Sequence, residues 1–347
     1  MEHNIDLSNY QLKTDLAIES LEYYDKDNTI LQDIKTVDDI VITTINVDEA
    51  GEKLINKKRG SYVTLTVGDV SDYDKRKKVS KVLIEQIKKL LLLMDIKDND
   101  KGLVIGIGNE KATVDALGSL TINKVMVTRH LFEVGADVKK GIRNVSAFNP
   151  GVMGNTGIET FTFIKNVVNS IKPNFVLVVD SLAASSMDRM NKTIQLTNTG
   201  IHPGSGVGNG RQELSIETLN VPVIAIGVPT VVNLSTIVDD TLDYLLKHLS
   251  YIKDNSNVYK FIFKHSSDYI DKLNSQKELS NEEKKEVLGL VGILTDSERK
   301  QLISELLMAI NYNLIVTEKG IDDIINYFSE ILSDSINNAL HRQVTHL

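Results

Sequence analysis

The chain has 347 residues, 41% of them hydrophobic and 25% charged, which is enough to bury a full core as one large domain or two smaller ones. Its 39 basic and 47 acidic residues give a net charge of −8, which disfavours direct binding of nucleic acid through the phosphates. The absence of cysteine excludes disulfides, thiolate nucleophiles and cysteine-ligated zinc.

The apolar runs of the chain predict a soluble, cytoplasmic protein that does not enter a membrane. The N-terminal residues Met1–Asp6 lack the basic region and apolar core of a signal peptide. The longest apolar run, Leu90–Met94, is far shorter than the about 20 residues that cross a bilayer. We therefore expect neither secretion nor membrane attachment.

In chain order, a polar and charge-rich stretch over residues 1–35 comes first, which is typical of a mobile arm. Hydrophobic periodicity then predicts the following elements: strands over 61–67, 103–107, 125–127, 175–179 and 221–226, and helices over 79–96, 113–122 and 158–171. Strands that alternate with helices indicate an α/β fold, with a mostly parallel sheet covered by helices on both faces.

After Thr236 the pattern becomes almost wholly helical, so we expect a helical C-terminal third over about residues 236–347. The expected helices, separated in one place by an irregular polar excursion over 253–276, cover 237–252, 281–291, 297–312 and 321–340. Apolar segments such as Leu302–Ile310 should pack against the core or against another subunit.

Two glycine-rich loops lie between the predicted elements. The first, Pro150–Gly157, precedes a predicted helix, and the second, Gly200–Arg211, does not have the spacing of a Walker A motif. Backbone N–H groups of such loops can face an anion or a peptide. We interpret four glycines as a candidate oxyanion or substrate-binding loop, with a plain surface connection as the alternative: Gly154, Gly204, Gly206 and Gly208.

Two aspartates follow strand-like apolar runs. Asp115 lies shortly after the run 103–107, and Asp180 ends the run 175–179. Each has an ordinary explanation alone, Asp115 as an acid in the first turn of a helix and Asp180 as an N-cap. In an open α/β sheet, however, the carboxyl ends of strands meet at one crevice. Paired carboxylates there can divide the acid and base roles of a hydrolysis, so we predict that Asp115 and Asp180 are catalytic.

Two alternatives remain open on the residues alone. One is a metal-dependent peptidase of the maturation type, which would use Asp115, Asp180 and a histidine such as His202. Against it, neither His130 nor His202 has a third ligand at metal-like spacing, so we expect no metal and no other cofactor. The other alternative is a protein-binding module without catalytic activity. A serine hydrolase is disfavoured, because no Gly-x-Ser-x-Gly elbow follows a strand.

Several segments together resemble the germination proteases of spore-forming bacteria, aspartic-type endopeptidases that degrade small acid-soluble spore proteins. The segments that carry this resemblance are residues 59–65, 106–118, 127–131, 150–160, 199–209 and 221–232. The match runs past residue 240 and then thins.

The resemblance implies an endopeptidase that is made as a zymogen, assembles as a homotetramer and degrades small acid-soluble spore proteins during spore germination, in the cytoplasm of the spore core. It also implies that Asp115 and Asp180 match the two essential aspartates of the family. The pattern of strand, Gly-x-Gly-Asn and acidic residue is similar to the hydrogenase-maturation endopeptidases, which implies a three-layer α/β fold.

The N-terminal segment Thr14–Glu19 resembles the substrate site of the family, which reads Thr-Glu, cleavage, then Phe-Ala-Ser-Glu. It has an acid, a bulky apolar residue, alanine, any residue and a second acid in the same order. We therefore predict self-cleavage between Asp15 and Leu16, because a tethered substrate has a high local concentration at its own active site. Residues 1–15 would be a propeptide that hinders the crevice, and residues 16–347 a single α/β peptidase domain.

Overall fold

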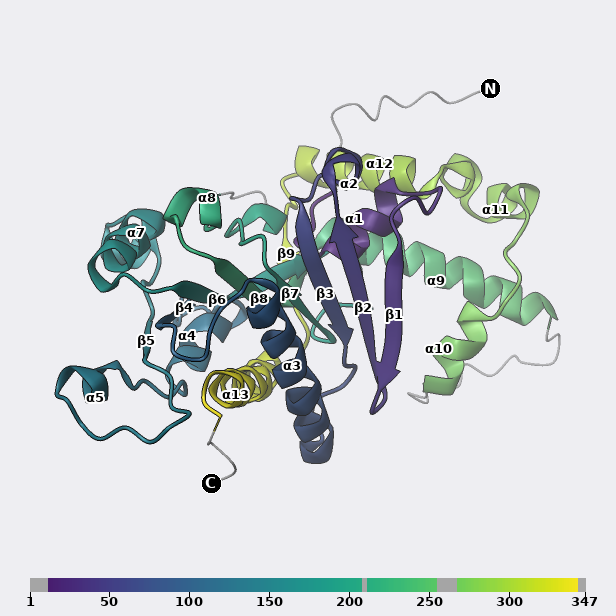
Figure 1. Ribbon diagram of the computed structural model, residues 1–347. Helices are drawn as coiled ribbons and strands as arrows, with labels where there is room; N and C mark the ends of the chain where they lie inside the picture. Colours follow the sequence, from purple (N-terminus) through teal and green to yellow (C-terminus); the bar gives the residue numbers. More distant parts are fainter. Residues whose placement is uncertain (1–11, 208–210, 255–266, 343–347) are drawn as a thin grey trace. The chain divides into compact units, whose positions relative to one another are not determined.

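The computed structural model describes residues 12–207, 211–254 and 267–342, which divide into two compact units (Figure 1). The sheet unit comprises Leu12–Val232 and the chain from Val316 onward. The inserted unit contains Asn233–Ile315 and is almost wholly helical. A helical C-terminal region is therefore present, as expected, but its helices are divided between the two units.

The strands form one nine-stranded sheet in the order β1-β2-β3-β7-β8-β6-β4-β5, with β9 paired to β8. Their bounds are β1 (Gln32–Val37), β2 (Ile40–Val47), β3 (Gly60–Thr66), β4 (Gly102–Gly106), β5 (Val145–Phe148), β6 (Phe175–Ala184), β7 (Thr193–Thr197), β8 (Val223–Asn233) and β9 (Ile315–Val316). Strands β5, β4, β6 and β8 run parallel, whereas β1, β2, β3 and β7 pair antiparallel.

The α/β class is thus confirmed, but the sheet is mixed rather than mostly parallel. The difference arises in the N-terminal part of the chain, for most of which the hydrophobic pattern predicted neither a helix nor a strand. Strands β1 and β2 are joined by Asp38 and Asp39, whose φ angles of 50° and 66° give the tight turn of an antiparallel hairpin. Both predicted aspartates belong to the parallel half of the sheet: Asp180 lies in β6, and Asp115 lies in a turn that follows β4.

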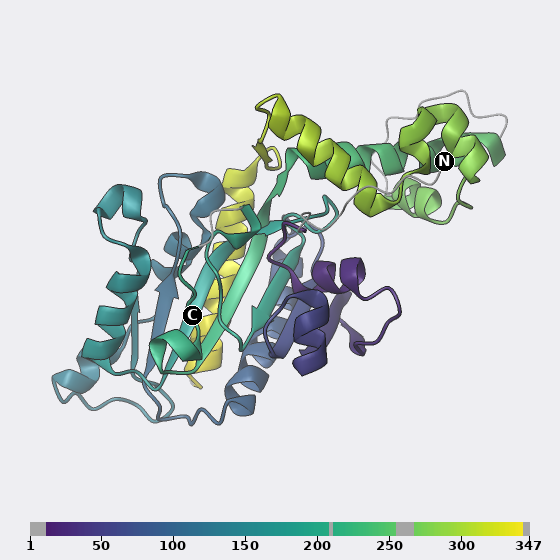
Figure 2. The ribbon, with the colours of Figure 1, turned by 90° about the horizontal axis from the view of Figure 1, so that it is seen from above.

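Helices cover the sheet on both faces, which gives the expected three layers. Along β6, Leu177 and Val179 belong to one core and Val176 and Val178 to the other, as the alternation of a strand requires. The first core is closed by α3 (Tyr73–Leu93), α4 (Leu117–Ile122) and α13 (Ile321–Leu340), and the second by α7 (Thr160–Ile171) and α8 (Ile216–Leu219). Helices α3 and α13 lie side by side in Figure 1, and Figure 2 shows α13 in yellow along the strands.

Three local expectations are wrong. The segment 12–35 is not a mobile arm, because α1 (Ala17–Tyr24) begins at two fully buried residues, Leu16 and Ala17, and packs against α2 (Glu49–Ile55). Residues 125–127 form no strand and instead lead to the short helix α5 (Arg129–Glu133). The excursion expected over 253–276 lies partly outside the described residues, and its described end is helix α10 (Ser267–Asn274).

The inserted unit is built from α9 (Leu234–Asp254), α10, α11 (Asn281–Leu288) and α12 (Asp296–Ala309). A buried ion pair ties α12 to α9, since Arg299 Nε lies 2.5 Å from the carboxylate of Asp239. In the described part of the chain, none of the helices is both long enough and apolar enough to span a membrane.

Candidate active site

Asp180 lies inside β6 rather than at a helix N-cap, because the strand continues to Ala184. Its side chain is 4% exposed, and its carboxylate accepts the N–H of Ser181 at 2.8 Å. Burial raises the pKa of Asp180 well above its ordinary value, and the nearby charges of Asp115 and Asp15 raise it further. The fold therefore penalises the ionised form of this carboxyl group.

Asp115 is held at the end of a single 3-10 turn, Thr113–Asp115, that follows β4. Its carboxylate accepts the N–H of Asn109 at 2.8 Å. Burial raises the pKa of Asp115, while the bond from Asn109 and the charge of Arg211 oppose this shift. Asp115 is only partly buried and has an N–H donor, so its ionised form is less penalised than that of Asp180.

Two glycines allow the backbone to pack closely around these aspartates, because a side chain at either position would collide with a backbone atom. Gly108 has a φ of +117°, and a Cβ there would lie 2.0 Å from the carbonyl oxygen of Asp115. In α4, a Cβ on Gly118 would lie 2.7 Å from the carbonyl oxygen of Val179, the residue before Asp180. The turn that carries Asp115 thus packs close to β6, and the charge of Asp115 helps to raise the pKa of Asp180.

A third carboxyl group, that of Asp15, lies near enough to Asp180 for its charge to raise the pKa of Asp180. Its N–H donates to the carbonyl of Ala183 at 3.0 Å, three residues beyond Asp180 on β6. Its carboxylate accepts the N–H of Ala183 at 2.8 Å, the N–H of Gly206 at 2.9 Å and the hydroxyl of Ser205 at 2.5 Å. The residue before the predicted cleavage point, Asp15, is therefore bound to β6 three residues beyond Asp180.

Of the four candidate loop glycines, Gly206 makes the contact with this segment. A Cβ on Gly206 would lie 2.4 Å from the carboxylate of Asp15, so the close approach requires glycine. Gly204 has a φ of +76° and turns the chain before Ser205. Gly154 lies in the exposed four-residue helix α6 (Met153–Thr156), with no atom within 4 Å of a Cβ placed on it, and Gly208 lies outside the described residues.

Sequence reasoning missed two polar residues that bind the segment Thr14–Glu19, namely Lys57 and Gln195. Lys57 Nζ donates to the carbonyl oxygens of Thr14 and Asp15 at 3.1 and 3.2 Å. Gln195, in β7, donates to the carbonyl of Asp15 at 3.1 Å. Glu19 is buried, and its carboxylate accepts the N–H of Ser185 at 2.7 Å. No sequence pattern distinguishes Lys57 or Gln195 from other polar residues. The resemblance of Thr14–Glu19 to a substrate site indicated only that this segment would have binding partners.

His202, which was considered as a metal ligand, lies next to a glutamate outside the predicted pair of aspartates. The Nε2 of His202 lies 3.1 Å from the carboxylate of Glu213, which also pairs with Lys58. Within the described ranges, no three histidine or acidic side chains are grouped so as to hold a metal ion.

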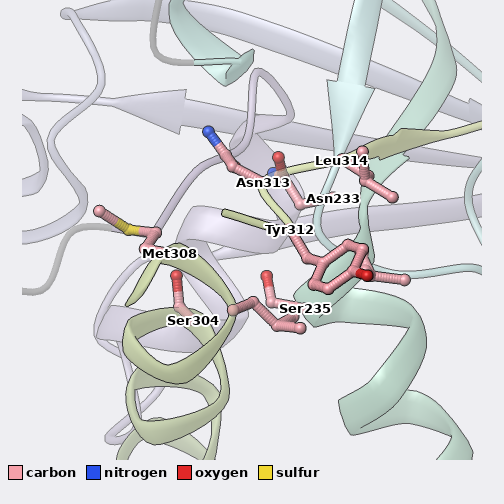
Figure 3. Close-up of a pocket in the computed structure, with 9 residues that line it drawn as sticks. Asn233, Ser235, Ser304, Met308, Tyr312, Asn313 and Leu314 are labelled. Carbon is pink, nitrogen blue, oxygen red and sulfur yellow. The ribbon is translucent and has the colours of Figure 1, made fainter. Parts of the chain in front are cut away.

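A small pocket lies within the inserted unit (Figure 3). It is lined by polar and apolar side chains that include Ser235, Ser304, Met308, Tyr312 and Asn313. It has no acidic, basic or histidine side chain in its lining, and neither aspartate belongs to it. We therefore assign it no part in the chemistry.

The fold places the chain among α/β proteins with a mixed sheet, in which the buried Asp180 has Asp115 and Asp15 as charged neighbours. The family model of the germination protease matches residues 11–346. Germination proteases from Oceanobacillus iheyensis and Bacillus subtilis are 43% and 41% identical, over 96% and 98% of this chain and 95% and 96% of their own lengths. That from Priestia megaterium is 39% identical over 99% of this chain and 97% of its own. The chain belongs to the germination protease family, as its motifs indicated, and is a peptidase.

Among solved structures, the chain is similar to the [NiFe] hydrogenase maturation protease HycI from Thermococcus kodakarensis KOD1. The two are 18% identical, with a TM-score of 0.28, and the match covers 42% of this chain and 80% of the other.

Proposed function

We propose that this chain is an aspartic-type endopeptidase, made as a zymogen, that degrades small acid-soluble spore proteins in the spore core during germination. The observation that carries the proposal is the pair formed by Asp115, in the turn after β4, and Asp180, inside the neighbouring strand β6, with a substrate-like segment bound further along β6 at Ala183. Membership of the germination protease family supports the same activity.

The two aspartates divide the work of hydrolysis. Both pKa values are raised, and burial acts more strongly on Asp180, so we assign the shared proton to Asp180. Asp180 is then the general acid that protonates the leaving nitrogen, and the ionised Asp115 is the base that takes a proton from water.

The same site cuts its own chain between Asp15 and Leu16, which makes residues 1–15 a propeptide. Asp15 supports this assignment, because its backbone and carboxylate are both bound at Ala183 and its charge reaches Asp180. Before the cut, Asp15 occupies the cleft and excludes substrate. After it, Leu16 and Ala17 are already buried in the fold, so the mature chain needs no refolding at its new N-terminus.

The first prediction is that Asp115→Asn and Asp180→Asn each block self-cleavage and proteolysis by a factor of roughly 10²–10⁴ or more, the contribution of general acid–base catalysis. The full chain is incubated at mildly acid pH, and its N-terminus and mass are followed with time. Wild type should yield a chain that begins at Leu16.

Circular dichroism and thermal melting of both variants provide the control for folding. Near wild-type cleavage by both single variants would contradict the dyad. A mature N-terminus elsewhere, or full activity with residues 1–15 still attached, would contradict the propeptide assignment.

A further inference from the structure

The carbonyl oxygen of Asp15, on the bond proposed to be cut, lies between two side-chain donors. Lys57 Nζ is 3.2 Å from this oxygen and Gln195 Nε2 is 3.1 Å from it. The donors come from different parts of the fold, Gln195 from the buried strand β7 and Lys57 from the connection between α2 and β3. A carbonyl that only needed a partner would be satisfied by one of them.

We infer that Lys57 and Gln195 are catalytic residues that polarise the carbonyl of the Asp15–Leu16 bond and hold its oxygen when negative charge develops during self-cleavage. This inference rests on the proposed function, in which Asp115 and Asp180 cut that bond. Fixed N–H donors aimed at a developing oxyanion are among the largest contributions to catalysis, because they need no rearrangement during the reaction.

Both donors are fixed in position before the reaction starts. The Oε1 atom of Gln195 accepts the N–H of Ala17 at 2.7 Å, which turns Nε2 toward Asp15. Lys57 also bonds the carbonyl of Thr14 at 3.1 Å, so its Nζ bridges two successive carbonyls. Burial lowers the pKa of Lys57, while the charges of Asp15 and Glu19 oppose this, and its nitrogen remains an N–H donor in either state.

The glycine loop, which the sequence suggested for the oxyanion, is engaged elsewhere. The N–H of Gly206 and the hydroxyl of Ser205 both donate to the side-chain carboxylate of Asp15. The loop thus binds the acidic side chain before the cut, and the carbonyl oxygen is left to Lys57 and Gln195.

The step balances with groups that are already at the site and one water molecule. The water oxygen bonds to the carbonyl carbon of Asp15 and gives a proton to Asp115, while the C=O electron pair moves to the oxygen between the two donors. The pair then returns, the C–N bond breaks, and the nitrogen of Leu16 takes the proton from Asp180. The products are a carboxyl group on Asp15 and an amine on Leu16.

The test measures the first-order rate of self-cleavage in the full-length chain by intact mass. Lys57→Met and Gln195→Leu should each slow it by roughly 10²–10³, the effect of losing one oxyanion donor. Lys57→Arg, which keeps an N–H donor, should retain at least about a tenth of the wild-type rate. Lys58→Met removes the neighbouring cation, which pairs with Glu213 and Glu217, and should cleave at nearly the wild-type rate.

Thermal melts of every variant separate slow chemistry from poor folding. Folded Lys57→Met and Gln195→Leu chains that cleave within about threefold of wild type would overturn the inference while leaving the dyad intact. Should these two fail to fold, Lys57→Arg decides, because a folded arginine variant without cleavage would also overturn it. If instead the Asp115→Asn variant cleaves normally, the proposed function itself is wrong, and so is the inference that Lys57 and Gln195 stabilise the oxyanion.

Discussion

At the scale of single residues, the site is defined by a carboxyl group that the fold keeps away from water. Asp180 sits in the central strand β6 with two further carboxyl groups nearby, those of Asp115 and Asp15. Such a placement is unfavourable for the ionised form, because burial and like charge both oppose ionisation. The ionised form of Asp180 is therefore expected to cost stability, which is typical of a residue kept for function.

The sign of this effect predicts how stability depends on pH. The folded state raises the pKa of Asp180 above 3.8, so it binds more protons than the unfolded state between 3.8 and the raised pKa. The free energy of unfolding should fall as the pH rises through that window. Asp180→Asn removes the penalty, so it should stabilise the fold at pH 7 by about 1 kcal/mol, which raises Tm by roughly 1–2 °C in a chain of this length, and the gain should shrink toward pH 4.

The comparison is made in an Asp115→Asn background, so that neither chain is shortened by self-cleavage during the melt. Calorimetry at several pH values between 4 and 7 measures the difference. If the variant is less stable at pH 7, or if its gain in stability does not change with pH, burial of the Asp180 charge does not account for the effect of this residue on stability.

At the scale of elements, the sequence predicted what depends on local periodicity. Helix α13 has the expected bounds, Ile321–Leu340, because its apolar residues recur at helical spacing. The sequence did not predict strand β7. Three of its five residues, Thr193–Thr197, are polar, although all five are buried in the structure. The sequence pattern ended the strand at residue 179, whereas β6 continues to Ala184, so Asp180 lies inside the strand and not at its end. The resemblance of Thr14–Glu19 to a substrate site suggested that Asp15 approaches the site, but it could not name the partners Ala183 and Gln195, which lie more than 160 residues away.

A prediction at this scale concerns the contact between α4 and the ends of β4 and β6. A Cβ on Gly118 would lie 2.2 Å from the carbonyl oxygen of Ile107 and 2.7 Å from that of Val179, both backbone atoms that cannot move alone. Gly118→Ala should therefore destabilise the fold by about 1–3 kcal/mol, as overpacking does, and should displace Asp115 and slow cleavage.

Urea denaturation measures the change, with Gly154→Ala as the control for stability. A Cβ on Gly154 meets no atom within 4 Å, so this variant should stay within about 0.5 kcal/mol of wild type. Equal stability of the Gly118 and Gly154 variants would mean that the tight α4 contact is not required.

At the scale of the whole molecule, the predicted catalytic residues and the exposed apolar face of helix α12 lie in different units. The sheet unit contains Asp15, Asp115 and Asp180, whereas the inserted unit contains α12. Four large apolar side chains of α12 and its C-cap are between 42% and 58% exposed: Leu302, Leu306, Met308 and Ile310. Three of them, at positions 302, 306 and 310, recur every four residues and so share one face of the helix.

We propose that this α12 face packs against a second copy of the chain and builds the homotetramer that the family resemblance implies. Exposed apolar surface of this kind favours association because its burial removes it from water. Leu306→Glu would place a charge at the centre of the face and should shift the protein toward smaller species at micromolar concentration, as measured by sedimentation velocity. Leu92→Glu is the matched control, because Leu92 is 79% exposed on α3 in the sheet unit and lies outside the α12 face. A wild-type chain that sediments as a stable monomer would refute assembly itself, and a Leu306→Glu variant that remains tetrameric would show that another surface carries it.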